Sequence, residues 1–98
     1  MIILDFLKDF GITDEIIYRI EMANDRALVF SFICAKDKVC KNIEYFRSIG
    51  IEVIELLLIY RLELFLNDLD KIKSSFANYD IKTLVQLINE DINAVNLL

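Results

Sequence analysis

The two cysteines, Cys34 and Cys40, are the residues of this chain best suited to covalent or metal chemistry. The sequence contains no histidine, so a cysteine nucleophile would have no imidazole base, and the Cys and His ligand sets of zinc sites are excluded. Two thiolates cannot complete a tetrahedral metal site by themselves. Because free cysteines are commonly buried, we interpret both as buried structural residues and predict no metal site and no cofactor.

Carboxylates are numerous, but none form a convincing catalytic pair. Asp14 and Glu15 lie where a helix is expected to begin, as do Asp68 and Asp70, and the helix dipole favours acidic side chains there. The chain also has no glycine-rich phosphate loop, no EF-hand spacing and no dinucleotide fingerprint. The sequence therefore predicts a protein that is not an enzyme and has no catalytic residue.

Basic residues gather in one segment, 36–47, which could contact phosphates. With two arginines brought near by the expected helix packing, the candidate nucleic-acid patch consists of Arg19, Arg26, Lys38, Lys41 and Arg47. The alternative interpretation is a solvated helix face, because Asp37 and Glu44 are interleaved with these cations. The chain has 11 basic and 16 acidic residues and a net charge of −5, whereas nucleic-acid binders gain affinity from an excess of basic residues. The charge therefore favours the solvated face and disfavours nucleic-acid binding.

The apolar content is high for a chain of 98 residues. Hydrophobic residues make up 56% of it, and the mean hydropathy is +0.45. A domain of this size has too little interior to hide so much apolar surface, so we expect part of it to face a protein partner or a second copy. Because a short turn cannot easily bury four large apolar side chains, the interface candidates are Leu62, Leu64, Phe65 and Leu66. Tyrosines could also act as interface anchors, namely Tyr18, Tyr45, Tyr60 and Tyr79.

The elements that must position these side chains are predicted to be helices. The chain has no proline and only two glycines, whereas β-folds need many turn residues. In the first expected helix, over 2–10, one face carries Ile3, Phe6, Leu7 and Phe10. Further helices are expected over 14–23, 38–49 and 52–61 and after caps at Asp68 and Asp80, with short apolar turns over 62–66 and 91–98. The apolar run 26–35 fits a buried strand or a short helix, and we favour a short helical turn because its neighbours are helical. Residues 1–98 are therefore predicted to form a single all-α domain.

One short phrase recurs along the chain. The segment 6–12, Phe-Leu-Lys-Asp-Phe-Gly-Ile, reappears over 45–51 as Tyr-Phe-Arg-Ser-Ile-Gly-Ile, and a degraded copy covers 76–81. Gly50 follows Gly11 by 39 positions, and Asp80, in the equivalent place, follows Gly50 by 30. A period in this range with helical units is typical of a solenoid. We therefore predict a short, right-handed helical-repeat array of about two and a half repeats, in which these three residues end equivalent helices.

This order of elements resembles the repeat of the mitochondrial transcription termination factor (mTERF) family. That repeat has a helix ending in an apolar-Gly-apolar phrase, a second helix with an early isoleucine, and an Asn-Pro-x-Leu-Leu turn. Here 10–12 and 49–51 stand for the phrase, and 24–28, Asn-Asp-Arg-Ala-Leu, stands for the turn with Asp25 in the place of proline. The resemblance implies a helical-repeat fold and nucleic-acid binding, although the chain lacks the many repeats and the basic concave face of the family.

The functional prediction is a non-enzymatic interaction protein that binds a protein partner, or itself, through an apolar surface. The first alternative is an mTERF-like protein that binds nucleic acid. The second is an acidic inhibitor that occupies the basic site of a nucleic-acid enzyme. That role would need clustered acids, such as Asp5, Asp9, Asp14 and Glu15.

The sequence gives no sign of a membrane segment. Its most apolar stretch, 53–66, is interrupted by Glu55, Arg61 and Glu63 and is shorter than the roughly 20 apolar residues that span a bilayer. The first nine residues are acidic early and lack the positive region of a signal peptide. Together with two unpaired cysteines, these features predict a cytoplasmic protein without a membrane partner.

Overall fold

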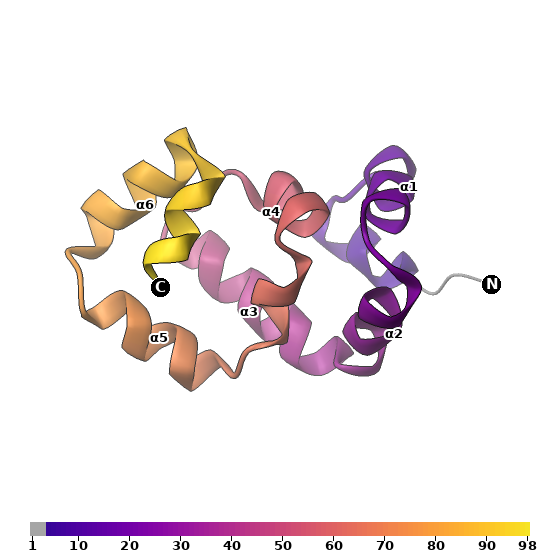
Figure 1. The fold of residues 1–98 in the computed structure, drawn as a ribbon, viewed down its shortest axis with the longest axis horizontal. Coiled ribbons are helices and arrows are strands. Elements are labelled where there is room, and N and C mark those ends of the chain that lie inside the picture. The colour runs from indigo at the N-terminus through magenta and orange to yellow at the C-terminus, as the bar shows by residue number, and fades with distance from the viewer. Residues whose placement is uncertain (1–3) are drawn as a thin grey trace.

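The computed structural model describes residues 4–98, which fold into helices joined by short turns (Figure 1). With η marking 3-10 helices, the elements are η1 (Asp5–Phe10), α1 (Asp14–Ala23), α2 (Arg26–Cys34), α3 (Lys36–Ser48), α4 (Ile54–Tyr60), η2 (Leu62–Leu66), α5 (Leu69–Ala77), α6 (Ile81–Glu90) and η3 (Ile92–Leu97). Within 4–98 there is no strand, so the all-α prediction is confirmed for this range. The run 26–35, expected as a short helical turn and not a strand, is helical and contains the nine-residue helix α2. Ile3 lies outside the described residues.

The recurring phrase closes its helix in the same way in its first two copies. Gly11 and Gly50 have φ angles of 80° and 98°, in the left-handed region that glycine adopts at little cost. In each copy the isoleucine after the glycine donates its N–H to the carbonyl five residues earlier, at 3.3 Å to Leu7 and 3.0 Å to Phe46. Both isoleucines are buried. The phrase is therefore a helix end that turns the chain and returns an apolar side chain to the core.

The third copy does not end a helix in this way. Helix α5 ends at Ala77, and Asp80 has a φ of −71° and precedes α6 as its N-cap residue. Its carboxylate accepts a hydrogen bond from the Thr83 hydroxyl at 2.6 Å, and Ile81 is 38% exposed. The prediction that Asp80 ends a helix equivalently to the glycines is therefore wrong. A non-glycine residue avoids the left-handed conformation, so the turn here is built differently.

The core is centred on the short helix η2. Phe65 is fully buried and meets Phe46 of α3 edge-to-face, with ring centroids 5.5 Å apart, and Phe32 of α2 in the same manner at 6.5 Å. Asn42 of α3, also fully buried, holds η2 in place. Its Nδ2 donates at 2.8 Å to both the Phe65 and the Asn67 carbonyl. Aromatic packing and one amide therefore fix η2 against its neighbours.

This burial corrects the prediction for 62–66. Leu62 and Phe65 are fully buried, while Leu64 and Leu66 are half-buried. The reason is that η2 packs against α2, α3 and α4 together, so three helices cover it. The premise that a short turn cannot bury large apolar side chains is therefore wrong here for two of the four candidates.

The molecule is elongated, with extents of 41, 24 and 23 Å along its principal axes. The helices follow one another along the longest axis (Figure 1). Figure 1 shows α1, α4 and α6 following one another along the upper side of the view. Helices α1 and α4 pack directly together, and Asn24, which follows α1, donates to the carbonyl of Ile59 in α4 at 3.1 Å. Asn89 of α6 donates to the Gly50 carbonyl at 3.0 Å, which ties α6 to the segment before α4.

Candidate functional site

The residues with the chemistry of a catalytic or metal site are not brought together. Cys34 is exposed, so the prediction that both cysteines are buried is wrong for it. Cys40 is half-buried, and burial raises the pKa of its thiol. Within 4–98, no three His, Cys, Asp or Glu side chains converge as metal ligands would. Among the described residues, neither thiol therefore belongs to a cluster of metal-ligating side chains.

The most distinctive surface feature is a set of exposed apolar side chains. Six of the nine large apolar residues that are exposed in the described chain lie on α1, α4 and α6, whereas α3 and α5 expose none. We call these six the α1–α4–α6 face: Tyr18, Met22, Leu56, Tyr60, Ile81 and Leu87. The other three are Phe30, Tyr79 and Leu97. Helices α1 and α4 pack directly together, whereas Leu87 of α6 lines a small pocket with Tyr79 and Leu97. Exposed apolar residues on neighbouring elements indicate an interaction site.

Helical spacing places these side chains outward. In α1, Ile17 and Ile20 point to the core, so Tyr18 and Met22, four positions apart, share the opposite side and are 61% and 67% exposed. In α4, Leu57 and Leu58 are buried, and Leu56 and Tyr60, again four apart, are exposed. Each helix therefore has two apolar sides, one used by the core and one left open.

Charge is divided between the same two sets of helices. Helices α1, α4 and α6 carry five acidic and two basic residues, whereas α3 and α5 carry three acidic and six basic residues. The first set has a net charge of −3 and the second a net charge of +3. The apolar side chains are thus exposed on the acidic set of helices.

Lysines of α3 and α5 lie over aromatic rings of η1 and α3, respectively. Lys36 of α3 lies 5.6 Å from the ring centre of Phe6 in η1, and Lys73 of α5 lies 5.5 Å from that of Tyr45 in α3. Phe6 and Tyr45 occupy the same position of the recurring phrase. A cation over an aromatic ring stabilises the contact by about 0.5–1 kcal/mol at exposed sites. These basic residues therefore help to join α3 to η1 and α5 to α3.

The five residues of the predicted nucleic-acid patch have separate surroundings. Arg47 donates to the Phe10 carbonyl and lies 5.6 Å from the ring centre of that residue. Lys38 pairs with Asp68 at 2.8 Å, and the lysine lowers the pKa of this carboxyl. Lys41 lines the same shallow depression as Lys38, together with Asp68 and Asp70. The other two, Arg19 and Arg26, lie on α1 and at the start of α2. Among residues 4–98, one depression therefore brings together Lys38 and Lys41, and the three arginines do not line it.

The acids that an inhibitor role would need are partly neutralised. Lys8 lies 2.9 Å from Asp14 and 3.8 Å from Asp5, and both carboxylates raise the pKa of its ammonium group, Asp14 the more. All three side chains are exposed, so this network contributes little to stability. It does reduce the negative charge that this end of the molecule presents.

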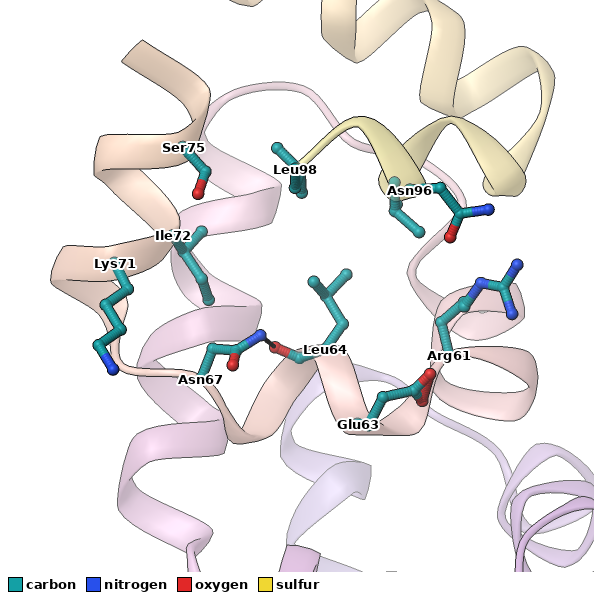
Figure 2. A pocket seen from close by; sticks show the side chains of 10 residues that line it. Arg61, Glu63, Leu64, Asn67, Lys71, Ile72, Ser75, Asn96 and Leu98 are labelled. Atoms are coloured by element: carbon teal, nitrogen blue, oxygen red, sulfur yellow. Dashed lines mark hydrogen bonds between the residues drawn. The ribbon is translucent and has the colours of Figure 1, made fainter. Parts of the chain in front are cut away.

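A pocket of about 450 Å³ opens between η2, α5 and η3 (Figure 2). Leu64 points into it from one side and Leu98 faces it from the other, while Arg61 and Lys71 lie at opposite edges. Arg61 donates to the Asn93 side chain at 2.6 Å. The remaining lining residues are Glu63, Asn67, Ile72, Ser75, Val95 and Asn96. Of the four interface candidates, Leu64 therefore lines this pocket, and sequence patterns gave no signal for its polar neighbours.

Comparisons with known proteins add no assignment, because the chain matches no protein-family model, no curated protein and no solved structure. In residues 4–98, no helix has the length and apolar character needed to cross a bilayer. What the surface can do chemically follows from its own residues. It offers apolar contacts and carboxylates on one set of helices and cations engaged with aromatic rings on the other.

Proposed function

We propose that this protein is a non-enzymatic interaction protein that binds another protein through the α1–α4–α6 face. The observation that carries the proposal is the uneven distribution of exposed large apolar side chains: six of the nine in the described chain lie on these three helices and none lies on α3 or α5. Tyr18 and Tyr60 combine an apolar ring with a hydroxyl that can reach water, a combination enriched in protein interfaces. Two of the tyrosines named from the sequence thus belong to the proposed surface.

The proposal includes a repeated architecture. Three groups of elements follow the same order: η1-α1-α2, α3-α4-η2 and α5-α6-η3. In each, a first helix is followed by a turn, a second helix and a short apolar third helix. Three pairs of equivalent elements in neighbouring groups pack together: α1 on α4, α2 on η2 and α3 on α5. These contacts support a short helical-repeat array. The array has fewer than three full repeats because η1, the first helix of the first group, is shortened.

Such an array explains why one face would hold the binding residues. Stacked repeats align equivalent helices, so their outward sides form one extended surface. Here the second helices of the three groups are α1, α4 and α6. The resemblance to the mTERF repeat agrees with this order, and the helix ends at Gly11 and Gly50 support it. The proposed protein-binding role differs from that family because the exposed apolar residues, and not a basic surface, are the dominant feature.

Nucleic-acid binding has less support. The cations of α3 and α5 include Lys36, Arg47 and Lys73, which lie over aromatic rings, and Lys38, which pairs with Asp68. Binding phosphates would compete with these contacts. A gel shift at low salt, where phosphate contacts are strongest, would favour this alternative if it detected a complex.

The test is selective capture of a partner from lysate of the source cells. The immobilised wild-type chain is compared with Tyr18→Ser/Leu56→Ser and with a control on the other helices, Lys41→Ser/Ser74→Ala, after circular dichroism shows that all three are folded. We expect a protein that wild type and the control retain and the face variant loses, and that rebinds after purification. The proposal is overturned if no such protein is found, or if the control loses it equally.

A further inference from the structure

We infer that the partner presents a cationic amphipathic helix, which docks on the α1–α4 part of this face. This inference rests on the proposed function and adds the chemistry of the occupant. Two kinds of observation carry it. One is the geometry of the exposed apolar pairs, and the other is the charge around them.

The apolar pairs match what a docking helix needs. Tyr18 and Met22 follow one side of α1, and Leu56 and Tyr60 follow one side of α4. These helices pack together, and Asn24 joins their C-terminal ends. Rows of side chains four positions apart form the ridges between which another helix packs. Helix α1 has ten residues, about 15 Å, which matches roughly three turns of a docked helix with apolar residues three and four apart.

The carboxylates on α1 and α4 indicate that the partner is positively charged. Glu15 on α1 and Glu55 on α4 are exposed and lie on the same helices as the apolar pairs, as does the half-buried Glu21. Within 4–98, none of these three carboxylates forms an ion pair. Arg19 is the only cation on the two helices. A helix with lysine or arginine beside its apolar stripe would be complementary, whereas an acidic helix would be repelled.

The same charges argue against a second copy of this chain as the occupant. A symmetric dimer would place the face against itself and would oppose like charges, because α1, α4 and α6 have a net charge of −3. The α3 and α5 side of a second copy has the opposite charge but exposes no large apolar side chain to cover the face. A partner that is both apolar and cationic satisfies both requirements.

The test uses two synthetic 18-residue helical peptides with the same leucine stripe, one with lysine and one with glutamate at the remaining positions. Binding to the full chain is measured by fluorescence anisotropy. We expect the lysine peptide to bind more tightly than the glutamate peptide. Glu15→Gln/Glu55→Gln should weaken the lysine peptide about three- to tenfold, as expected for removing two exposed charge contacts. The control Asp9→Asn/Glu44→Gln removes two charges elsewhere and should change its affinity less than twofold.

Two double variants test the charge and the apolar contacts separately: Glu15→Gln/Glu55→Gln and Tyr18→Ser/Met22→Ser. The inference is wrong if the peptides bind equally, if neither binds, or if the control weakens binding as much as the test pair. Tyr18→Ser/Met22→Ser examines the apolar face itself, so lysine-peptide binding that is unaffected by it contradicts the placement on α1. None of these results alters the capture experiment, which alone decides whether the face binds a protein. Light scattering of the free chain would overturn the choice of occupant if it showed a dimer that Leu56→Ser dissociates.

Discussion

At the scale of single residues, Asn42 shows how one polar group specifies a core. It is the only fully buried polar side chain in the described chain. Its amide is oriented by its partners, because the two neighbouring carbonyl oxygens can accept hydrogen bonds only from the NH2 group. Its Oδ1 is buried without a partner among residues 4–98. The unpaired oxygen is destabilising, but the two hydrogen bonds that Nδ2 donates to carbonyls at the end of η2 offset this effect.

We predict that Asn42→Ala lowers the free energy of unfolding by about 2–3 kcal/mol, because buried acceptors lose their donors. Asn42→Asp should be more damaging at neutral pH, since a carboxylate would face two carbonyl oxygens. Its deficit should shrink in acid, where the protonated acid can donate one hydrogen bond. Urea unfolding at pH 7 and pH 4 measures both effects. Equal stability of Asn42→Asp and wild type at pH 7 would contradict the hydrogen-bond assignment.

A second residue-scale prediction concerns Asp68. Lys38 lowers the pKa of this carboxyl in the folded chain, so the ion pair stabilises the fold above the ordinary pKa of about 4. That contribution is lost as the pH falls through the lowered folded value. Asp68→Asn should therefore be less stable than wild type at pH 7, and the difference should disappear towards pH 2. Asp70→Asn, which removes a carboxylate that forms no ion pair within residues 4–98, is the control and should lose less stability at pH 7.

At the scale of elements, the recurring phrase was informative where it contains glycine. Apolar residues three and four positions apart predicted most of the helices, because that spacing lets a helix bury one face. Asp25, which the sequence placed in a turn, instead caps α2 by accepting a hydrogen bond from the Leu28 N–H. The third copy misled, since Asp80 cannot cheaply adopt the left-handed turn. The burial of η2 was also missed, because it depends on α2, α3 and α4 meeting around it, which no local pattern reveals.

We predict that Gly50→Ala and Gly11→Ala each destabilise the chain by about 1–2 kcal/mol, the cost of a left-handed conformation for a residue with a Cβ. Space is not the cause, because a Cβ at Gly50 would meet its nearest neighbour at an ordinary 3.7 Å, and one at Gly11 would meet nothing within 4 Å. Asn78→Ala, at a φ of −73°, is the matched control in the third copy. Thermal unfolding that shows the same loss for all three would refute this account.

The candidate surface was partly predictable at the element scale. The excess of apolar residues indicated an interface and its position was sought in 62–66, whereas six of the nine exposed large apolar residues of the described chain lie on α1, α4 and α6. A signal was present in α1, where Tyr18 and Met22 are four apart on the side opposite Ile17 and Ile20. Using it requires knowing that no other helix covers that side. Only the packed structure supplies this information.

At the scale of the whole molecule, apolar exposure and charge follow the same division. Helices α1, α4 and α6 expose apolar side chains and are acidic, while α3 and α5 are basic and expose no large apolar residue. Contacts of lysine and arginine with aromatic rings join consecutive first helices. In this account one side of the molecule holds the array together and the other is available to a partner.

The most direct test of this division is site-specific photo-cross-linking. A benzophenone amino acid replaces Met22 on α1 in one sample and Ser74 on α5 in the other, both exposed positions, and each folded chain is irradiated with the partner isolated by capture. The account predicts a covalent adduct from position 22 and none from position 74. An adduct that forms from position 74 alone, or equally from both positions, would contradict the α1–α4–α6 face as the binding surface.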